Sequence, residues 1–173
     1  MRAGLVLIAA LLLGVAPAAA QGKTKTPPGV QVLELCELFA SGDVLAVETA
    51  LDQGWDAYEA ESESPYVRTY DAFKDINGLG YADLYVLVES YSDRTFGYCR
   101  VDFNETVGDA ASQVEAIVGL DRYDAETTKN DEGSYASLIG TYGNQDRLLL
   151  THATDSTFVI QLSVTIPKAA ASQ

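Results

Sequence analysis

The feature that most constrains the fold is a pair of cysteines, each on the apolar side of a differently periodic segment. Cys36 belongs to a stripe with the i, i+3, i+4, i+7 spacing of a helix face: Val32, Leu35, Cys36 and Phe39. Cys99 belongs to the apolar side of an alternating, strand-like segment: Gly97, Cys99, Val101 and Phe103. A helix packed on a sheet would bring the two thiols together, so we predict a Cys36–Cys99 disulfide.

A reactive thiol and a metal site are the alternative roles for these cysteines. A nucleophilic thiol needs a neighbouring base, and the single histidine, His152, lies far along the chain. A structural zinc site takes about four cysteine or histidine ligands, and the chain has only two cysteines and one histidine. We therefore expect structural cysteines, and we assign no metal ligand and no cofactor.

The N-terminus has the pattern of a secretory signal peptide. Arg2 precedes an apolar run from Leu5 to Val15, and three alanines stand before Gln21. This pattern predicts cleavage after Ala20 and a periplasmic or secreted protein, in a compartment where disulfides form. The apolar run is shorter than the roughly 20 residues of a membrane-spanning helix, so we expect no integral membrane segment after cleavage.

The chain is acidic, with 25 Asp and Glu against 11 Lys and Arg and a formal charge of −14. Nucleic acids and anionic lipids are bound through basic patches, so this charge argues against both as partners. An acidic surface can attract a cationic partner, or it can simply keep the protein soluble.

The periodic segments predict an α+β fold in which a twisted antiparallel sheet of five or six strands carries two N-terminal helices and one middle helix on one face. The expected helices cover 30–40, 44–51 and 106–118, and the expected strands cover 66–73, 81–89, 96–103, 135–142, 147–153 and 158–166. We expect residues 21–29 to be a flexible lead-in, 30–168 to form a single domain and 169–173 to be a disordered tail. The acidic segment 56–64 and the polar segment 121–133 are expected to be loops.

Three local features refine this layout. The second helix is expected to turn Val44, Val47 and Leu51 inward. The segment from Thr106 to Asp109 matches a capping box for the third helix. The pattern Ser/Thr-Asp-x-Thr-Phe occurs at 92–96 and again at 154–158, which indicates either a duplicated hairpin or two hairpins with the same turn chemistry.

Tyrosine is the most informative residue type for binding, with 10 tyrosines against five phenylalanines and one tryptophan. Period-two alternation places several of them on the faces of the first strand group, beside arginine. We predict a binding surface on the open sheet face, with Trp55 as a further ligand platform or as packing over the helices: Tyr70, Tyr85, Tyr98, Arg100 and Trp55. The alternative is that tyrosine only fills an outer sheet face, which suits its strand preference.

No catalytic constellation stands out, and we assign no catalytic residue. His152 shares a strand face with Leu148 and Leu150, and the Gly-x-Ser-x-Gly and glycine-rich phosphate motifs are missing from the sequence. A group of acids falls within one segment, but without calcium-loop spacing: Asp121, Asp124, Glu126, Asp131 and Glu132.

These observations favour a small exported binding or accessory module, which contacts an envelope protein, a peptide or a small-molecule ligand. One alternative is an inhibitor of a basic secreted hydrolase, acting through the loop Asp56–Pro65. The other is a hydrolase that uses His152 or a pair of carboxylates. Whether the chain is an enzyme stays open, although the missing motifs favour a non-enzymatic role.

Overall fold

The computed structural model describes residues 25–169, so the predicted signal peptide and the tail from 170 onward lie outside the described residues. The elements follow in the order α1 (Pro28–Ala40), α2 (Ala46–Asp52), β1 (Asp56–Ala60), β2 (Val67–Ile76), β3 (Gly80–Ser90), β4 (Arg94–Asn104), α3 (Ala110–Val118), β5 (Asp124–Asn130), β6 (Gly133–Tyr142), β7 (Gln145–Ala153) and β8 (Thr157–Pro167).

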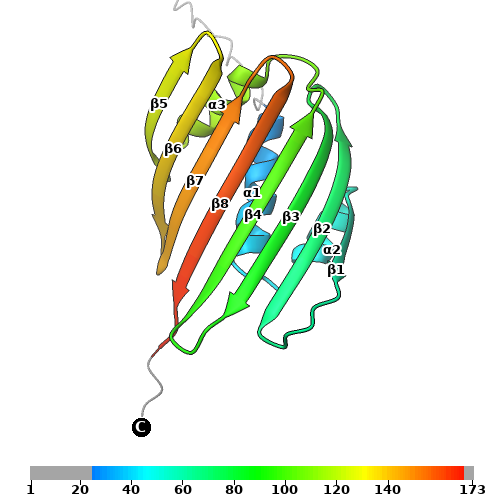
Figure 1. The fold of residues 1–173 in the computed structure, drawn as a ribbon, viewed down its shortest axis with the longest axis vertical. Coiled ribbons are helices and arrows are strands. Elements are labelled where there is room, and N and C mark those ends of the chain that lie inside the picture. Colours follow the sequence, from blue (N-terminus) through cyan, green and yellow to red (C-terminus); the bar gives the residue numbers. More distant parts are fainter. Residues whose placement is uncertain (1–24, 170–173) are drawn as a thin grey trace, which may run out of the picture.

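All eight strands form one antiparallel sheet in the order β1-β2-β3-β4-β8-β7-β6-β5. Each half of the chain contributes a helical segment followed by a four-stranded meander, and β4 and β8 pair at the centre of the sheet (Figure 1). The predicted α+β class and the antiparallel pairing are confirmed. The predicted number of five or six strands is wrong.

The two strands that the sequence analysis treated as loops are the edge strands, β1 and β5. β1 pairs only with β2, and β5 pairs only with β6. Every residue of β5 is exposed, so its polar sequence carries no alternation of apolar residues. Polar and charged residues are common on edge strands because they discourage pairing with other chains. Backbone pairing therefore defines these strands without an apolar signature in the side chains.

The helices lie behind the sheet in the view of Figure 1 and bury its inner face. α1 packs on β3, β4 and β8 and also contacts α3, which covers β5 to β8. α2 is peripheral, because its main contacts are with α1 and the edge strand β1. The core is therefore one layer between these helices and the inner face, with Phe39 of α1, Val101 of β4 and Ile160 of β8 buried in it.

α1 lies unusually close to β4, and a disulfide holds it there. Cys36 and Cys99 are bonded and fully buried, with their Cα atoms 5.6 Å apart, which confirms the predicted pairing. Two residues earlier on β4, a Cβ atom on Gly97 would lie 1.7 Å from the carbonyl oxygen of Ala40. Glycine is thus required at this position by contact with the helix backbone. The disulfide is also consistent with a location outside the cytoplasm.

A buried ion-pair cluster joins α1 to the second half of the chain. Glu37 Oε1 accepts hydrogen bonds from Arg122 Nε at 2.9 Å and from the Tyr123 hydroxyl at 2.7 Å, and it lies 3.1 Å from Arg147 Nη1. Arg147 is buried on β7. Burial and the hydrogen bond to Glu37 raise the pKa of Tyr123, so its hydroxyl remains a donor at neutral pH.

Three local predictions about the helices are wrong. Val44 and Leu51 are exposed, and the buried residues of α2, which begins two residues later than expected, are Ala46 and Ala50. Of the three residues predicted to face inward, only Val47 packs against the core, where it is partly buried. α3 begins at Ala110, where the Asp109 side chain accepts a hydrogen bond from Ser112 N at 3.2 Å. The capping box from Thr106 therefore does not form. At the N-terminus, Pro28 and Gly29 of the expected lead-in already belong to α1.

The repeated Ser/Thr-Asp-x-Thr-Phe pattern marks two corresponding hairpins, β3–β4 and β7–β8, but it does not align their residues. The hairpins close on the pairs Ser90–Thr95 and Ala153–Phe158, an offset of 63 residues (90 to 153). The pattern itself recurs after 62 residues (92 to 154). Because side chains alternate along a strand, Phe96 lies on the outer face whereas Phe158 is buried in the core.

Among residues 25–169, the structure contains no helix with the length and apolar character of a membrane span.

Replacing both cysteines by alanine should lower the free energy of unfolding by about 2–4 kcal/mol, because the unfolded chain is no longer cross-linked. Urea unfolding of the oxidised wild type and the double variant measures this difference. Addition of a reductant should destabilise only the wild type. Equal stabilities of the oxidised wild type and the variant would contradict the role given to the disulfide.

Glu37→Gln should destabilise the fold by about 3 kcal/mol, because it leaves the buried guanidinium of Arg147 without a compensating charge. The matched control is Glu34→Gln, an exposed position on the same helix, which should change stability by less than about 0.5 kcal/mol. Both are measured by urea unfolding, and equal effects of the two substitutions would contradict the account.

Candidate functional site

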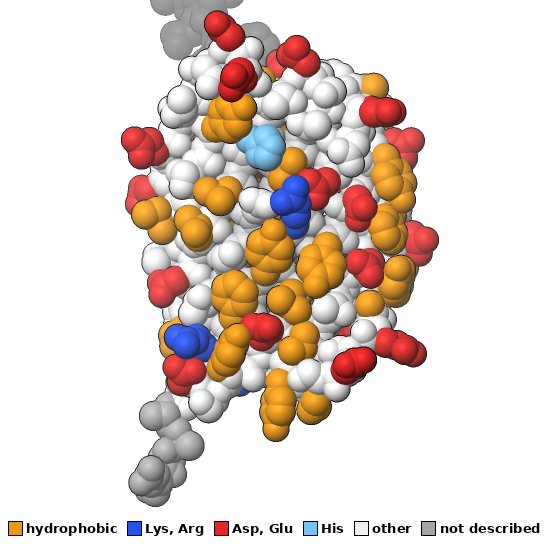
Figure 2. All heavy atoms as spheres, viewed as in Figure 1, with side chains coloured by type: hydrophobic (Ala, Val, Ile, Leu, Met, Phe, Trp, Pro, Cys, Tyr) orange, Lys and Arg blue, Asp and Glu red, His pale blue; other side chains and the backbone are white. Residues whose placement is uncertain are grey.

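The outer face of the sheet is not covered by any described element, and it collects side chains from seven strands. Strand pairing places these side chains in rows across the sheet, because residues directly opposite in register share a face. One row runs Tyr58, Asp71, Tyr85, Arg100, Gln161 and Leu150, and the next runs Phe73, Asp83, Asp102, Val159, His152 and Tyr135. Figure 2 shows this face, with hydrophobic side chains over its middle and acidic side chains mainly around its border.

The structure brings together three of the five residues of the predicted binding surface. Tyr85 of β3 lies directly opposite Arg100 of β4, and Tyr98 lies one row away on the same face. Tyr85 is 41% exposed, whereas Tyr98 and Arg100 are half-buried. These three residues form the centre of the outer face.

Tyr70 is on the inner face, so its predicted place on the open surface is wrong. It pairs with Val86, which in turn pairs with Cys99, and this row is covered by α1. The Tyr70 ring packs 5.3 Å from the Phe39 ring, and burial raises the pKa of its hydroxyl. Tyr70 is a core residue.

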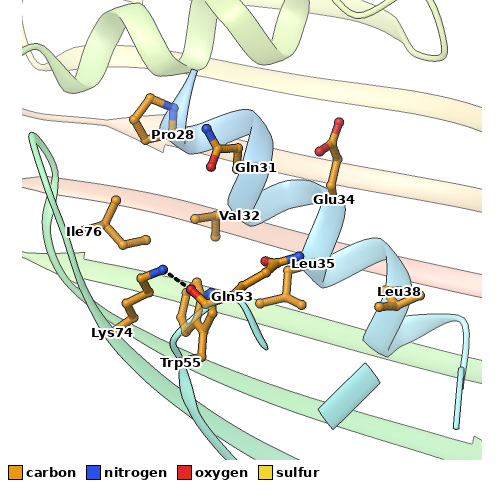
Figure 3. Close-up of a pocket in the computed structure, with 10 residues that line it drawn as sticks. All are labelled: Pro28, Gln31, Val32, Glu34, Leu35, Leu38, Gln53, Trp55, Lys74 and Ile76. Carbon is orange, nitrogen blue, oxygen red and sulfur yellow. Dashed lines mark hydrogen bonds between the residues drawn. The ribbon is translucent and has the colours of Figure 1, made fainter. Parts of the chain in front are cut away.

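Trp55 is also absent from the outer face. It is buried on the helix side of the sheet, immediately before β1, where its indole lines a groove of about 490 Å³ (Figure 3). The amine of Lys74 lies 5.9 Å from the centre of the Trp55 ring. The expected packing of Trp55 against the helices is therefore observed, and its possible use as a ligand platform would belong to this groove.

Arg100 is held by a neighbour on its own strand. Its Nε and Nη2 atoms donate to the two carboxylate oxygens of Asp102 at 2.5 and 2.7 Å. This bidentate geometry is the strong form of an arginine–carboxylate pair, and it raises the pKa of Arg100. Because Asp102 neutralises it, Arg100 does not present an unpaired positive charge on the outer face.

Two further carboxylates stand next to this pair. Asp83 lies directly opposite Asp102, and Asp71 lies opposite Tyr85 in the adjacent row. Partial desolvation raises the pKa of Asp83, and the charges of Asp102 and Asp71 raise it further. Ionised Asp83 is therefore disfavoured by its surroundings, so this part of the surface favours an added positive charge.

A cluster of exposed apolar side chains lies on β6 and β7 of the outer face. Leu148 and Leu150 of β7 are 47% and 42% exposed, and Ile139 of β6 is 67% exposed. Leu148 pairs with both Ile139 and Ser163, which places these leucines beside the central tyrosines across β8. Large apolar side chains that cluster on a sheet face and are open to solvent are characteristic of an interaction surface.

His152 lies at one end of the outer face and shows no catalytic geometry. Its ring stacks on Tyr135 with the centroids 5.8 Å apart, in a shallow depression that also includes Ser137 and Glu126. Among residues 25–169, no side chain forms a hydrogen bond with the imidazole of His152. Burial lowers the pKa of His152, the charge of Arg100 lowers it further, and Asp102 opposes both. The contacts of His152 therefore give no support for a catalytic pair of this histidine with a serine or a carboxylate.

The acidic segments take other forms than the sequence analysis expected. The proposed inhibitory loop Asp56–Pro65 begins as strand β1, and only its second part connects strands. Asp124 and Glu126 belong to β5, with their side chains exposed. In the described part of the chain, no three His, Cys, Asp or Glu side chains lie close enough to hold a metal ion.

Sequence reasoning missed the contribution of Asp71 and Asp83. Alternation alone places Asp83 with Tyr85, and Asp71 with Phe73, on one side of each strand. The register between strands is what gathers these residues with Arg100 and Asp102, and register is set by hairpin lengths and core packing.

Comparison of the chain with protein-family models, with curated proteins and with solved structures finds no match.

We expect nuclear magnetic resonance titration of the single histidine to give a pKa below 6.5, and Arg100→Gln to move it upward by removing a repulsive charge. The unfolded chain, with an ordinary histidine pKa near 6.5, binds this proton more readily than the folded chain does. The wild type should therefore lose stability relative to His152→Gln as pH falls from about 6.5 toward the lower pKa of the folded state. Urea unfolding across this range provides the second measurement. A pKa at or above 6.5 would contradict the environment described for His152.

Proposed function

We propose that this chain is an exported binding module, whose outer sheet face docks a protein partner that presents apolar side chains and a lysine or arginine. The proposal rests on one observation: the outer face combines exposed apolar side chains with carboxylates that are not neutralised by the protein itself.

The exposed apolar side chains of the outer face supply the driving force. Tyr85, Leu148 and Leu150 are each more than two-fifths exposed on a rigid sheet, so a partner can remove their surface from water without ordering a loop. Tyrosine is favoured in such contacts because its ring buries a large area and its hydroxyl can hydrogen-bond.

The acidic cluster supplies selectivity for a cationic group. Asp102 is paired with Arg100, whereas Asp71 and Asp83 have no ion pair among the described residues. Desolvation and the charges of Asp102 and Asp71 raise the pKa of Asp83, and a partner lysine or arginine beside it would offset both effects. The overall charge of −14 would attract a basic partner at a distance. The same charge argues against a second copy of this chain, because face-to-face pairing would bring two acidic clusters together.

A phage library of random 12-residue peptides, selected on the chain without residues 1–20, tests the proposal directly. The selected peptides should combine apolar or aromatic residues with lysine or arginine, and their affinity should fall as ionic strength rises. Their binding should weaken about ten-fold in Asp83→Asn, and also in Tyr85→Ser. The matched control is Glu48→Gln, an exposed acid on α2 at the helix side, which should bind normally.

Thermal unfolding of the same variants separates binding from folding. Asp83→Asn should raise the melting temperature at pH 7, because it removes a carboxylate that its neighbours disfavour, while it weakens peptide binding. Selection of neutral or acidic peptides would contradict the proposal, and so would equal affinity for the wild type and both outer-face variants. A concentration-dependent dimer abolished by Tyr85→Ser would assign the face to self-association instead.

A further inference from the structure

The groove beside Trp55 lies on the opposite side of the sheet from the docking face, and its chemistry is different. It runs between α1, the turn that carries Gln53 and Trp55, and β2, with a volume of about 490 Å³. Its apolar lining consists of Pro28, Val32, Leu35, Leu38, Trp55 and Ile76. Pockets of about 300–1,000 Å³ with mostly apolar walls and few polar groups are typical of small-molecule sites.

Lys74 provides the positive charge of this groove. Its amine donates to the carbonyl oxygen of Gln53 and lies over the Trp55 ring, so the side chain is held in place (Figure 3). No carboxylate forms an ion pair with Lys74 among residues 25–169, even though the protein is strongly acidic. An ammonium group has three donor hydrogens, so the bond to Gln53 leaves two of them available.

The neighbouring polar groups do not neutralise this charge. Glu34 lies along the same groove, but Figure 3 shows its carboxylate directed away from Lys74. Gln31, on the next turn of α1 toward the N-terminus, offers an uncharged amide. The end of the groove around Lys74 is therefore locally cationic, while its floor is apolar.

From these contacts we infer that the groove binds a small amphiphile with an apolar body and a single carboxylate. The apolar body would lie along Val32, Leu35 and the Trp55 indole, and the carboxylate would accept hydrogen bonds from the two available donors of Lys74. Charge complementarity selects an anion over a neutral or cationic head group of the same length. This inference does not depend on the docking role of the outer face.

The single tryptophan makes the site directly observable, because all indole fluorescence of the chain arises from Trp55. Decanoate, titrated below its micelle concentration, should produce a saturable change in Trp55 emission, and calorimetry should give the same affinity. Decan-1-ol and decyltrimethylammonium have the same apolar body, and both should bind at least about ten-fold more weakly than decanoate.

Lys74→Met keeps an unbranched side chain of similar shape, one atom shorter, and removes its charge. Decanoate affinity should fall about ten-fold or more in this variant, while decan-1-ol affinity should change less than about two-fold. Lys74→Arg should restore most of the decanoate affinity. The control Lys168→Met, at the far end of β8, should leave it unchanged. Thermal unfolding of every variant confirms that the fold is intact.

Four results would overturn this inference: no saturable change with decanoate, equal affinity for decanoate and decan-1-ol, tighter binding of decyltrimethylammonium, or unchanged decanoate affinity in Lys74→Met. None of these results would bear on the outer face, because peptide binding there is measured separately.

Discussion

The contact between α1 and β4 is the interaction on which the rest of the structure depends. The Cys36–Cys99 bond joins the middle of the helix to the centre of the sheet, and the contact of Ala40 with Gly97 sets how closely they approach. Glu37, one residue after the cysteine, then binds Arg122 and Arg147 of the second half. A single helix therefore fixes both meanders, with a covalent bond to one half and buried charges to the other.

This arrangement assigns different roles to the two faces of the sheet. With α1 and α3 on the inner face, that side becomes the core. One opening on it is the groove beside Trp55, near the β1 edge. The outer face is left to solvent with Tyr85, Leu148 and Leu150 exposed, an arrangement that lowers solubility unless charges surround it. The acidic border and the overall negative charge serve that purpose, and they also bias the face toward basic partners.

The sequence allowed the disulfide and the central strands to be predicted because each has a clear apolar period. The edge strands escaped prediction because β5 is polar on both sides and is defined by backbone pairing alone. Tyr70 was placed on the wrong face because alternation gives the sides of one strand, while only the pairing of Tyr70 with Val86 shows which side is covered. The acidic cluster depends on the same register. The Trp55 groove joins residues from α1, from the turn before β1 and from β2, and no local sequence pattern indicates that these segments meet.

Residue-resolved tyrosine iodination, with and without a saturating selected peptide, tests most directly whether the outer face is the docking surface. Tyr85 and Tyr142 are both exposed in the free chain but lie on opposite sides of the sheet, so each serves as the internal control for the other. The account predicts that the peptide protects Tyr85 and leaves Tyr142 reactive. Protection of Tyr142 with Tyr85 still reactive would contradict it.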